Sequence, residues 1–289
     1  MRWTAAILAG LVGAGQLTLF VVAERQLRTT LAVLGPTPEA SPLRWAWVVA
    51  WSFPWFVGAV LLASRARRVG VAVVVTSALL LVSTGFAGLR PLLTWPIEAP
   101  AGEVAVLVDR YGGAAVWVGA LVAGLLAWFA RPRGGWRGGA PGPAGWYVAL
   151  AVFAWMPSAF QTLAFAPPGA PRRFVEADAV VLAGLEQTAS FLGAGTTALL
   201  LFVAPRLRRD LGGAVLLAFA VPSLFAELSG VVRVATEEFV ILTPPGVLGL
   251  IGVIGLVVTG VVWMVRGPAG TRTDAQWRNQ GSRPGSSTG

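Results

Sequence analysis

The chain has 289 residues, of which 56% are hydrophobic and 12% are charged, whereas roughly a quarter of the residues are charged in an average soluble domain. It contains no Cys, His or Lys, so all 22 basic residues are arginines, and the formal net charge is +9. This composition excludes disulfides, Cys or His metal sites, thiolate nucleophiles and Schiff-base lysines. We therefore expect a membrane protein with no metal and no cofactor.

Eight apolar windows follow one another along the chain, each close to the roughly 20 residues that a helix needs to cross a bilayer core. They cover residues 4–23, 45–63, 69–88, 114–130, 146–165, 179–203, 213–232 and 247–265. The predicted fold class is all-α, a multi-pass membrane bundle of eight transmembrane helices. The first window also has features of a cleaved signal peptide, with residues 21–23 as a cleavage site, but its length favours a retained helix.

The arginines predict how the bundle is oriented. If the N-terminus is cytoplasmic, 14 arginines and two acidic residues face the cytoplasm, and eight arginines and nine acidic residues face outwards. An arginine excess of this kind marks cytoplasmic loops, so both termini are expected in the cytoplasm and the protein in the cell inner (plasma) membrane. A basic chain can also indicate nucleic-acid binding. Here the arginines are spread over short loops, which favours membrane lipid and not nucleic acid as the partner.

Four pairs of short segments resemble each other in the two halves of the chain, in the same order and 135 to 145 residues apart. They are 16–20 with 161–165, 65–68 with 206–209, 88–90 with 231–233, and 128–131 with 263–266. The pattern indicates a 4+4 tandem repeat in which both halves share one orientation, as in some transporters. The alternative is that apolar helices resemble one another by composition.

This pattern divides the chain into four predicted parts. Residues 1–133 form the first four-helix membrane repeat and residues 146–266 form the second. Residues 134–145 are a cytoplasmic Gly/Pro linker between them. Residues 267–289 are rich in Gly, Ser and Pro without an apolar pattern, which is typical of a disordered cytoplasmic tail.

Two glutamates inside the spans, Glu186 and Glu227, are the strongest candidates for chemistry, because a charge in the bilayer is costly. Each is expected about 7 Å outside the midplane, at 1.5 Å per helical residue. Other polar and aromatic side chains should line the same pocket in the outer half of the bundle and bind a ligand: Gln16, Trp51, Trp55, Gln161, Gln187, Ser223 and Arg233. The alternative for the polar groups is hydrogen bonding between helices that serves packing alone.

Trp51 and Trp55 are expected near the midplane, where the aromatic belt of a membrane interface does not explain them. One interpretation is an aromatic wall for a lipophilic or cationic ligand. The other is bulky packing or lipid contact.

Three functions fit this sequence. The first is binding or translocation of a small lipophilic molecule, with the two glutamates responding to protons. The second is an intramembrane enzyme for acid-catalysed cyclisation or isomerisation of an isoprenoid-like substrate, with a glutamate as general acid. The third is a non-catalytic subunit of a membrane complex with protein partners. The sequence alone does not choose among them, nor does it give the substrate or the oligomeric state.

Overall fold

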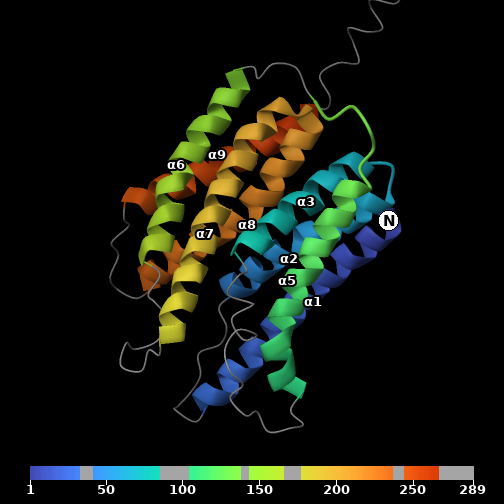
Figure 1. The fold of residues 1–289 in the computed structure, drawn as a ribbon. Helices are drawn as coiled ribbons and strands as arrows, with labels where there is room; N and C mark the ends of the chain where they lie inside the picture. The colour runs from blue at the N-terminus through green and yellow to red at the C-terminus, as the bar shows by residue number, and fades with distance from the viewer. Residues whose placement is uncertain (33–41, 85–103, 138–142, 166–176, 237–243, 267–289) are drawn as a thin grey trace, which may run out of the picture.

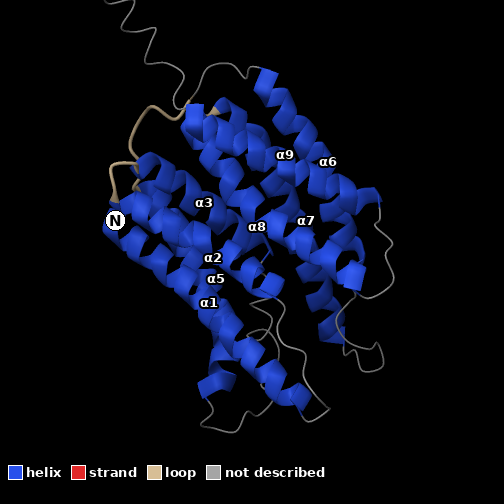
Figure 2. Ribbon diagram, turned by 180° about the vertical axis from the view of Figure 1, so that it is seen from behind, coloured by secondary structure: helices blue, strands red, loops and turns tan. Residues whose placement is uncertain are grey.

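A computed structural model describes residues 1–32, 42–84, 104–137, 143–165, 177–236 and 244–266 of the chain. These residues form eight α-helices and one short 3-10 turn, and no strand occurs among them (Figures 1 and 2). The helices are α1 (Arg2–Ala32), α2 (Pro42–Ala63), α3 (Arg67–Thr84), α5 (Val104–Phe129), α6 (Pro143–Phe165), α7 (Ala177–Val203), α8 (Arg209–Thr236) and α9 (Pro244–Arg266). The prediction of an all-helical fold is therefore confirmed.

Four of the helices contain stretches that are long and apolar enough to cross a membrane. These stretches are Arg2–Val22, Tyr111–Phe129, Arg209–Leu228 and Gly246–Arg266, and shorter apolar stretches lie in α2, α6 and α7. Many large apolar side chains point away from the bundle, among them Ile7, Phe129, Leu192 and Val265, each more than 60% exposed. An exposed apolar surface of this extent fits a lipid environment, so the helices make a bundle suited to a membrane.

Several helices extend beyond the apolar windows. α1 continues to Ala32, and α5 begins at Val104, ten residues before the predicted window. α6 begins at Pro143, inside the segment predicted as a linker. Hydropathy marks only the part of a helix that lies in hydrocarbon, and a helix can continue into water beyond it. Proline suits the first position of a helix, since the amide hydrogen that it lacks has no helical partner there.

The buried side chains form two clusters. The first core is built by small residues of α1 and α5, by Trp55 and Leu62 of α2, and by one face of α3. The second core is built by α6, α7, α8 and α9, together with the opposite face of α3. α3 therefore lies between the two groups of helices and is packed on both sides, which explains why its residues 70–78 are almost all buried (Figure 1).

Glycines allow some helices to approach until their backbones touch. A methyl group on Gly252 of α9 would lie 2.5 Å from the carbonyl oxygen of Ala151 and 2.9 Å from the amide nitrogen of Trp155, both in α6. In the same way, a methyl group on Gly70 would collide with the backbone of Leu62. Such contacts are common between membrane helices, which associate through close packing of small residues.

Arginine side chains cap carbonyl groups at one end of the bundle. Arg2 donates a hydrogen bond to the carbonyl of Ala63 at the end of α2, and Arg67 donates one to the carbonyl of Ala130, directly after α5. The last carbonyls of a helix lack partners and carry partial negative charge. The arginine-rich end therefore stabilises the helix ends that meet there.

Candidate functional site

In the first group of helices (α1, α2, α3 and α5), the buried side-chain atoms without a hydrogen-bond partner include oxygen atoms of two serines and one glutamine. Ser52 of α2 is 1% exposed and Ser77 of α3 is 5% exposed, and the hydroxyl oxygen of each is unpaired. Gln16 of α1 is half-buried, and its side-chain carbonyl oxygen is buried and unpaired. We call Gln16, Ser52 and Ser77 the polar layer. An unpaired polar group is costly in an apolar interior and calls for an explanation.

Several other hydroxyl groups in the described helices find a partner in their own helix. Each of the following bonds the carbonyl one turn earlier, at 2.7 to 2.9 Å: Thr18, Thr196, Ser223 and Thr259. This local bond is the usual way for Ser or Thr to be satisfied inside a helix. Ser52 and Ser77 depart from that pattern, which leaves their hydroxyls available to another group.

Helix register places Gln16 and Ser52 at the same height. α1 and α2 run in opposite directions, because Arg2 meets Ala63 at one end, and a methyl group on Gly13 would lie 3.1 Å from Cβ of Trp55. Three residues further on in α1 and three residues back in α2 lead to Gln16 and Ser52, both about 4.5 Å beyond that contact.

Ser77 lies somewhat nearer the arginine-rich end. The contact between Gly58 and Val74 aligns α2 with α3, so that Ser77 is level with Trp55. The three members of the polar layer therefore lie within about one helical turn of one another along the bundle axis.

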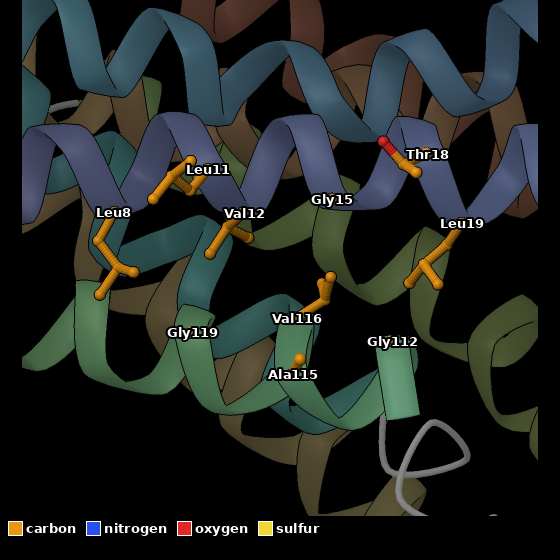
Figure 3. Close-up of a pocket in the computed structure, with 10 residues that line it drawn as sticks. All are labelled: Leu8, Leu11, Val12, Gly15, Thr18, Leu19, Gly112, Ala115, Val116 and Gly119. Carbon is orange, nitrogen blue, oxygen red and sulfur yellow. The ribbon is translucent and has the colours of Figure 1, made fainter. Parts of the chain in front are cut away.

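A groove of about 300 Å³ runs between α1 and α5 on the outside of the first group (Figure 3). Its walls are apolar apart from the hydroxyl of Thr18, which is bonded to Ala14. Small residues make the room: Gly15 on α1 and Gly112, Ala115 and Gly119 on α5. The other lining residues are Leu8, Leu11, Val12, Leu19 and Val116. A hydrocarbon chain suits a groove of this composition.

Gln16 lies on α1 between two residues that line this groove. Val12, Gln16 and Leu19 are spaced four and three residues apart, so they share one stripe of α1, and both Val12 and Leu19 line the groove. Gln16 therefore lies on α1 beside residues that line the apolar groove, and at the height of Ser52 of α2. A molecule with an apolar chain and a polar end would find both kinds of surface here.

The two predicted tryptophans have different surroundings. Trp55 is 1% exposed and belongs to the first core, where it packs on Gly13. Trp51 is half-buried and packs against the second core. Trp55 therefore packs between α1 and α2 and is not among the residues that line the α1–α5 groove.

Glu227 lies half-buried on α8, one turn beyond Ser223, whose hydroxyl bonds the carbonyl of Phe219 at 2.9 Å. The main neighbours of α8 are α2, α3 and α9, whereas those of α1 are α2 and α5. Gln16 and Glu227 were predicted to line one pocket, but they lie on helices that are not main neighbours of each other. Four further predicted residues have side chains outside the described part of the structure: Gln161, Glu186, Gln187 and Arg233.

Sequence reasoning missed Ser52 and Ser77. Serine is common in membrane helices, and nothing in the sequence separates a serine bonded to its own helix from an unpaired one. The available signal was weaker: Ser52 lies next to Trp51 in the helix that was singled out for its aromatic residues. Gln16, by contrast, was predicted from its residue type and its depth alone.

Comparison of the chain with protein-family models, with curated proteins and with solved structures finds no match. The class of protein therefore comes from the fold itself. The described residues form an all-helical bundle with at least four helices long and apolar enough to span a membrane.

Proposed function

We propose that this protein binds or translocates a small lipophilic molecule within the membrane. The observation that carries the proposal is the position of Gln16, which shares a stripe of α1 with two residues of an apolar groove and lies level with Ser52. The hydrocarbon part of the molecule lies between α1 and α5, and its polar end reaches Gln16 and Ser52. A hydroxyl or carbonyl group of the molecule would satisfy polar atoms that have no partner in the protein.

The polar end should be uncharged. In the spanning parts of α1, α2, α3 and α5, the charged residues lie at the ends, as Arg2 and Arg67 do. A charged group at the polar layer would have no counter-charge from these helices, which is unfavourable in a medium of low polarity. We therefore expect the ligand to be an alcohol, ketone, quinone or ester, and not a fatty acid or an amine.

The test is mass spectrometry of lipophilic molecules that remain with the full chain after mild detergent purification. We expect one class of molecule with an uncharged polar end, at close to one per chain and enriched over the lipids of the whole membrane. An extract with the composition of the bulk membrane would contradict the proposal. Glu227 and Glu186 remain candidate proton-responsive groups, and a pH-dependent release of the molecule would support that role.

We further propose that the bundle is a 4+4 repeat with α1, α2, α3 and α5 equivalent to α6, α7, α8 and α9. The contacts between the groups support this. Under this equivalence α3 corresponds to α8 and α2 corresponds to α7. The contact between α3 and α7 should then have a counterpart between α8 and α2, and the contact between α3 and α8 should be its own counterpart. All three contacts are present. Contacts that map onto each other in this way are typical of two-fold symmetry. One contact within the groups departs from it: α2 packs along α3, whereas α7 packs mainly on α3 and α6.

A detail of the backbone supports the same repeat. The amide of Gly70 donates a hydrogen bond to the carbonyl of Ala66, and Gly70 lies close to the backbone of Leu62. Likewise, the amide of Gly212 donates to the carbonyl of Arg208, and Gly212 lies close to the backbone of Ala204. Each of the three positions in the second turn is 142 residues after its counterpart in the first. Turns of the same construction therefore join α2 to α3 and α7 to α8.

The orientation with the arginine-rich end in the cytoplasm is part of the proposal. Ala66 is exposed at that end, whereas Ala101 and Ala170 lie between windows on the predicted outer side. Single cysteines at these positions can be labelled without background, since the chain has none of its own. In intact cells an impermeant thiol reagent should label positions 101 and 170, while position 66 should react only after lysis. The opposite labelling would invert the orientation.

A further inference from the structure

The connecting segments at the arginine-rich end of the bundle form one continuous surface. Three connecting segments form it, residues 64–68, 130–137 and 204–210, and together they contain nine arginines and one acidic residue, Asp210. We call these three segments the arginine patch. Asp210 forms an ion pair with Arg208 at 3.1 Å, so the acidic group of the patch is already engaged.

Backbone hydrogen bonds join two of the segments across the two groups of helices. Arg137 and Leu207 form an antiparallel bridge, and the amide of Arg208 donates to the carbonyl of Trp136 at 3.1 Å. The ring of Trp136 packs against both cores, and its Nε1 donates to the carbonyl of Pro132 at 2.8 Å. The seam between the two groups is therefore closed at this end by a fixed pair of loops.

The arginines of the patch fall into two sets. One set is used by the protein itself: Arg67 caps Ala130, Arg68 packs on Gly135, and Arg208 pairs with Asp210. The other set is exposed: Arg65, Arg131, Arg133, Arg137, Arg206 and Arg209. Of these, Arg131 also bonds the carbonyl of Trp128 at 3.3 Å. Arg137 and Arg206 lie on adjoining segments of backbone, because Arg137 pairs with Leu207, the residue after Arg206. Exposed arginines gathered on adjoining segments repel one another, and a bound anion would relieve that repulsion.

Apolar side chains border the patch on the outside of the bundle. The guanidinium of Arg131 lies over the ring of Trp128, 3.6 Å from its centre. Trp128 is 44% exposed and Phe129 is 69% exposed. Tryptophan and arginine stacked at the end of an apolar helix are typical of the depth at which lipid headgroups lie. A ligand of this surface can therefore contact arginines and hydrocarbon-facing rings at once.

We propose that the seam around Arg137 and Arg206 binds the phosphate of an anionic phospholipid, with the acyl chains of the lipid beside Trp128 and Phe129. Guanidinium groups pair with phosphate oxygens in a bidentate manner, and basic pockets between membrane helices recognise anionic headgroups. The apolar border favours a lipid over a small soluble phosphate, which would have no use for it. This binding is independent of the molecule in the α1–α5 groove.

The test is native mass spectrometry of the full chain in a non-ionic detergent, with phosphatidylglycerol or phosphatidylcholine of the same acyl chains added. The variant is Arg137→Gln/Arg206→Gln, and the control Arg266→Gln/Arg272→Gln removes the same charge elsewhere. We expect the wild type to prefer phosphatidylglycerol, the variant to bind it at least tenfold more weakly, and the control to stay within about twofold of the wild type. Arg137→Lys/Arg206→Lys keeps the charge without the bidentate geometry and should fall between them.

Three results would overturn the proposal. The first is equal binding of the two lipids by the wild type. The second is an equal loss in variant and control, which would indicate attraction by net charge alone. The third is displacement of phosphatidylglycerol by inorganic phosphate or glycerol phosphate at similar concentration, which would indicate a site for a small soluble phosphate. A melting temperature for each variant within a few degrees of the wild type ensures that folded proteins are compared.

Discussion

Replacing Gly252 with alanine should strongly destabilise the packing of α6 on α9. The new methyl carbon would lie 2.5 Å from the carbonyl oxygen of Ala151 and 2.9 Å from the amide nitrogen of Trp155. Both are backbone atoms, so no side chain can move away, and α6 and α9 would have to separate. Separating two packed helices removes contacts along their whole length. We expect a loss of about 3 kcal/mol or more, seen as a fall in the melting temperature in detergent and in the yield of folded protein.

Gly195 provides the matched control. It lies in α7, and a methyl group there would have nothing within 4 Å. Alanine is a better helix former than glycine by up to about 1 kcal/mol, so Gly195→Ala should be neutral or slightly stabilising. If Gly252→Ala melts like Gly195→Ala, the close contact between α6 and α9 does not exist in the protein.

Gln16→Leu should maintain or raise the stability of the protein while weakening its binding of the lipophilic molecule. Leucine removes a buried polar oxygen that has no partner and restores an apolar stripe with Val12 and Leu19. Since an unpaired polar group in an apolar interior is costly, the empty protein should be as stable as the wild type or more stable by about 1 kcal/mol. The same change removes a hydrogen-bonding group from the ligand site, so retention of the lipophilic molecule should fall by about tenfold or more. Melting temperature and bound molecule per chain are the two measurements.

Thr196→Val is the control for this change. The hydroxyl of Thr196 is exposed and bonded to the carbonyl of Leu192, and α7 is not part of the groove. We expect no change in retention. A Gln16→Leu protein that keeps its molecule as well as Thr196→Val does would show that Gln16 serves packing alone, which is the alternative that the sequence left open.

Hydropathy was enough to predict the helices but not their ends. An apolar window reports where a helix is in contact with hydrocarbon, and each of the eight windows overlaps one described helix. The extensions of α1 and α5 are polar in part, with Asp109 and Arg110 inside α5, so they could not be told from loops. The grouping of helices around two cores depends on packing across the bundle, which no local pattern contains.

The candidate site was predicted only in part, for a physical reason. Charge in a membrane span is a strong signal, so the sequence pointed to Glu186 and Glu227. The polar layer contains no charge, and its distinguishing property is that Ser52 and Ser77 lack the bond to their own helix that Ser223 makes. That property depends on rotamers and neighbours, which are visible only in three dimensions.

The groove between α1 and α5 can be filled directly. Ala115 is exposed and lines it, whereas Val118, three residues further along α5, is 49% exposed and lies outside it. The deciding measurement is the amount of lipophilic molecule bound per chain in the wild type, in Ala115→Trp and in Val118→Trp. We predict a near-complete loss in Ala115→Trp and an unchanged amount in Val118→Trp. An unchanged amount in Ala115→Trp would show that the molecule does not lie in this groove, and the proposed function would lose its site.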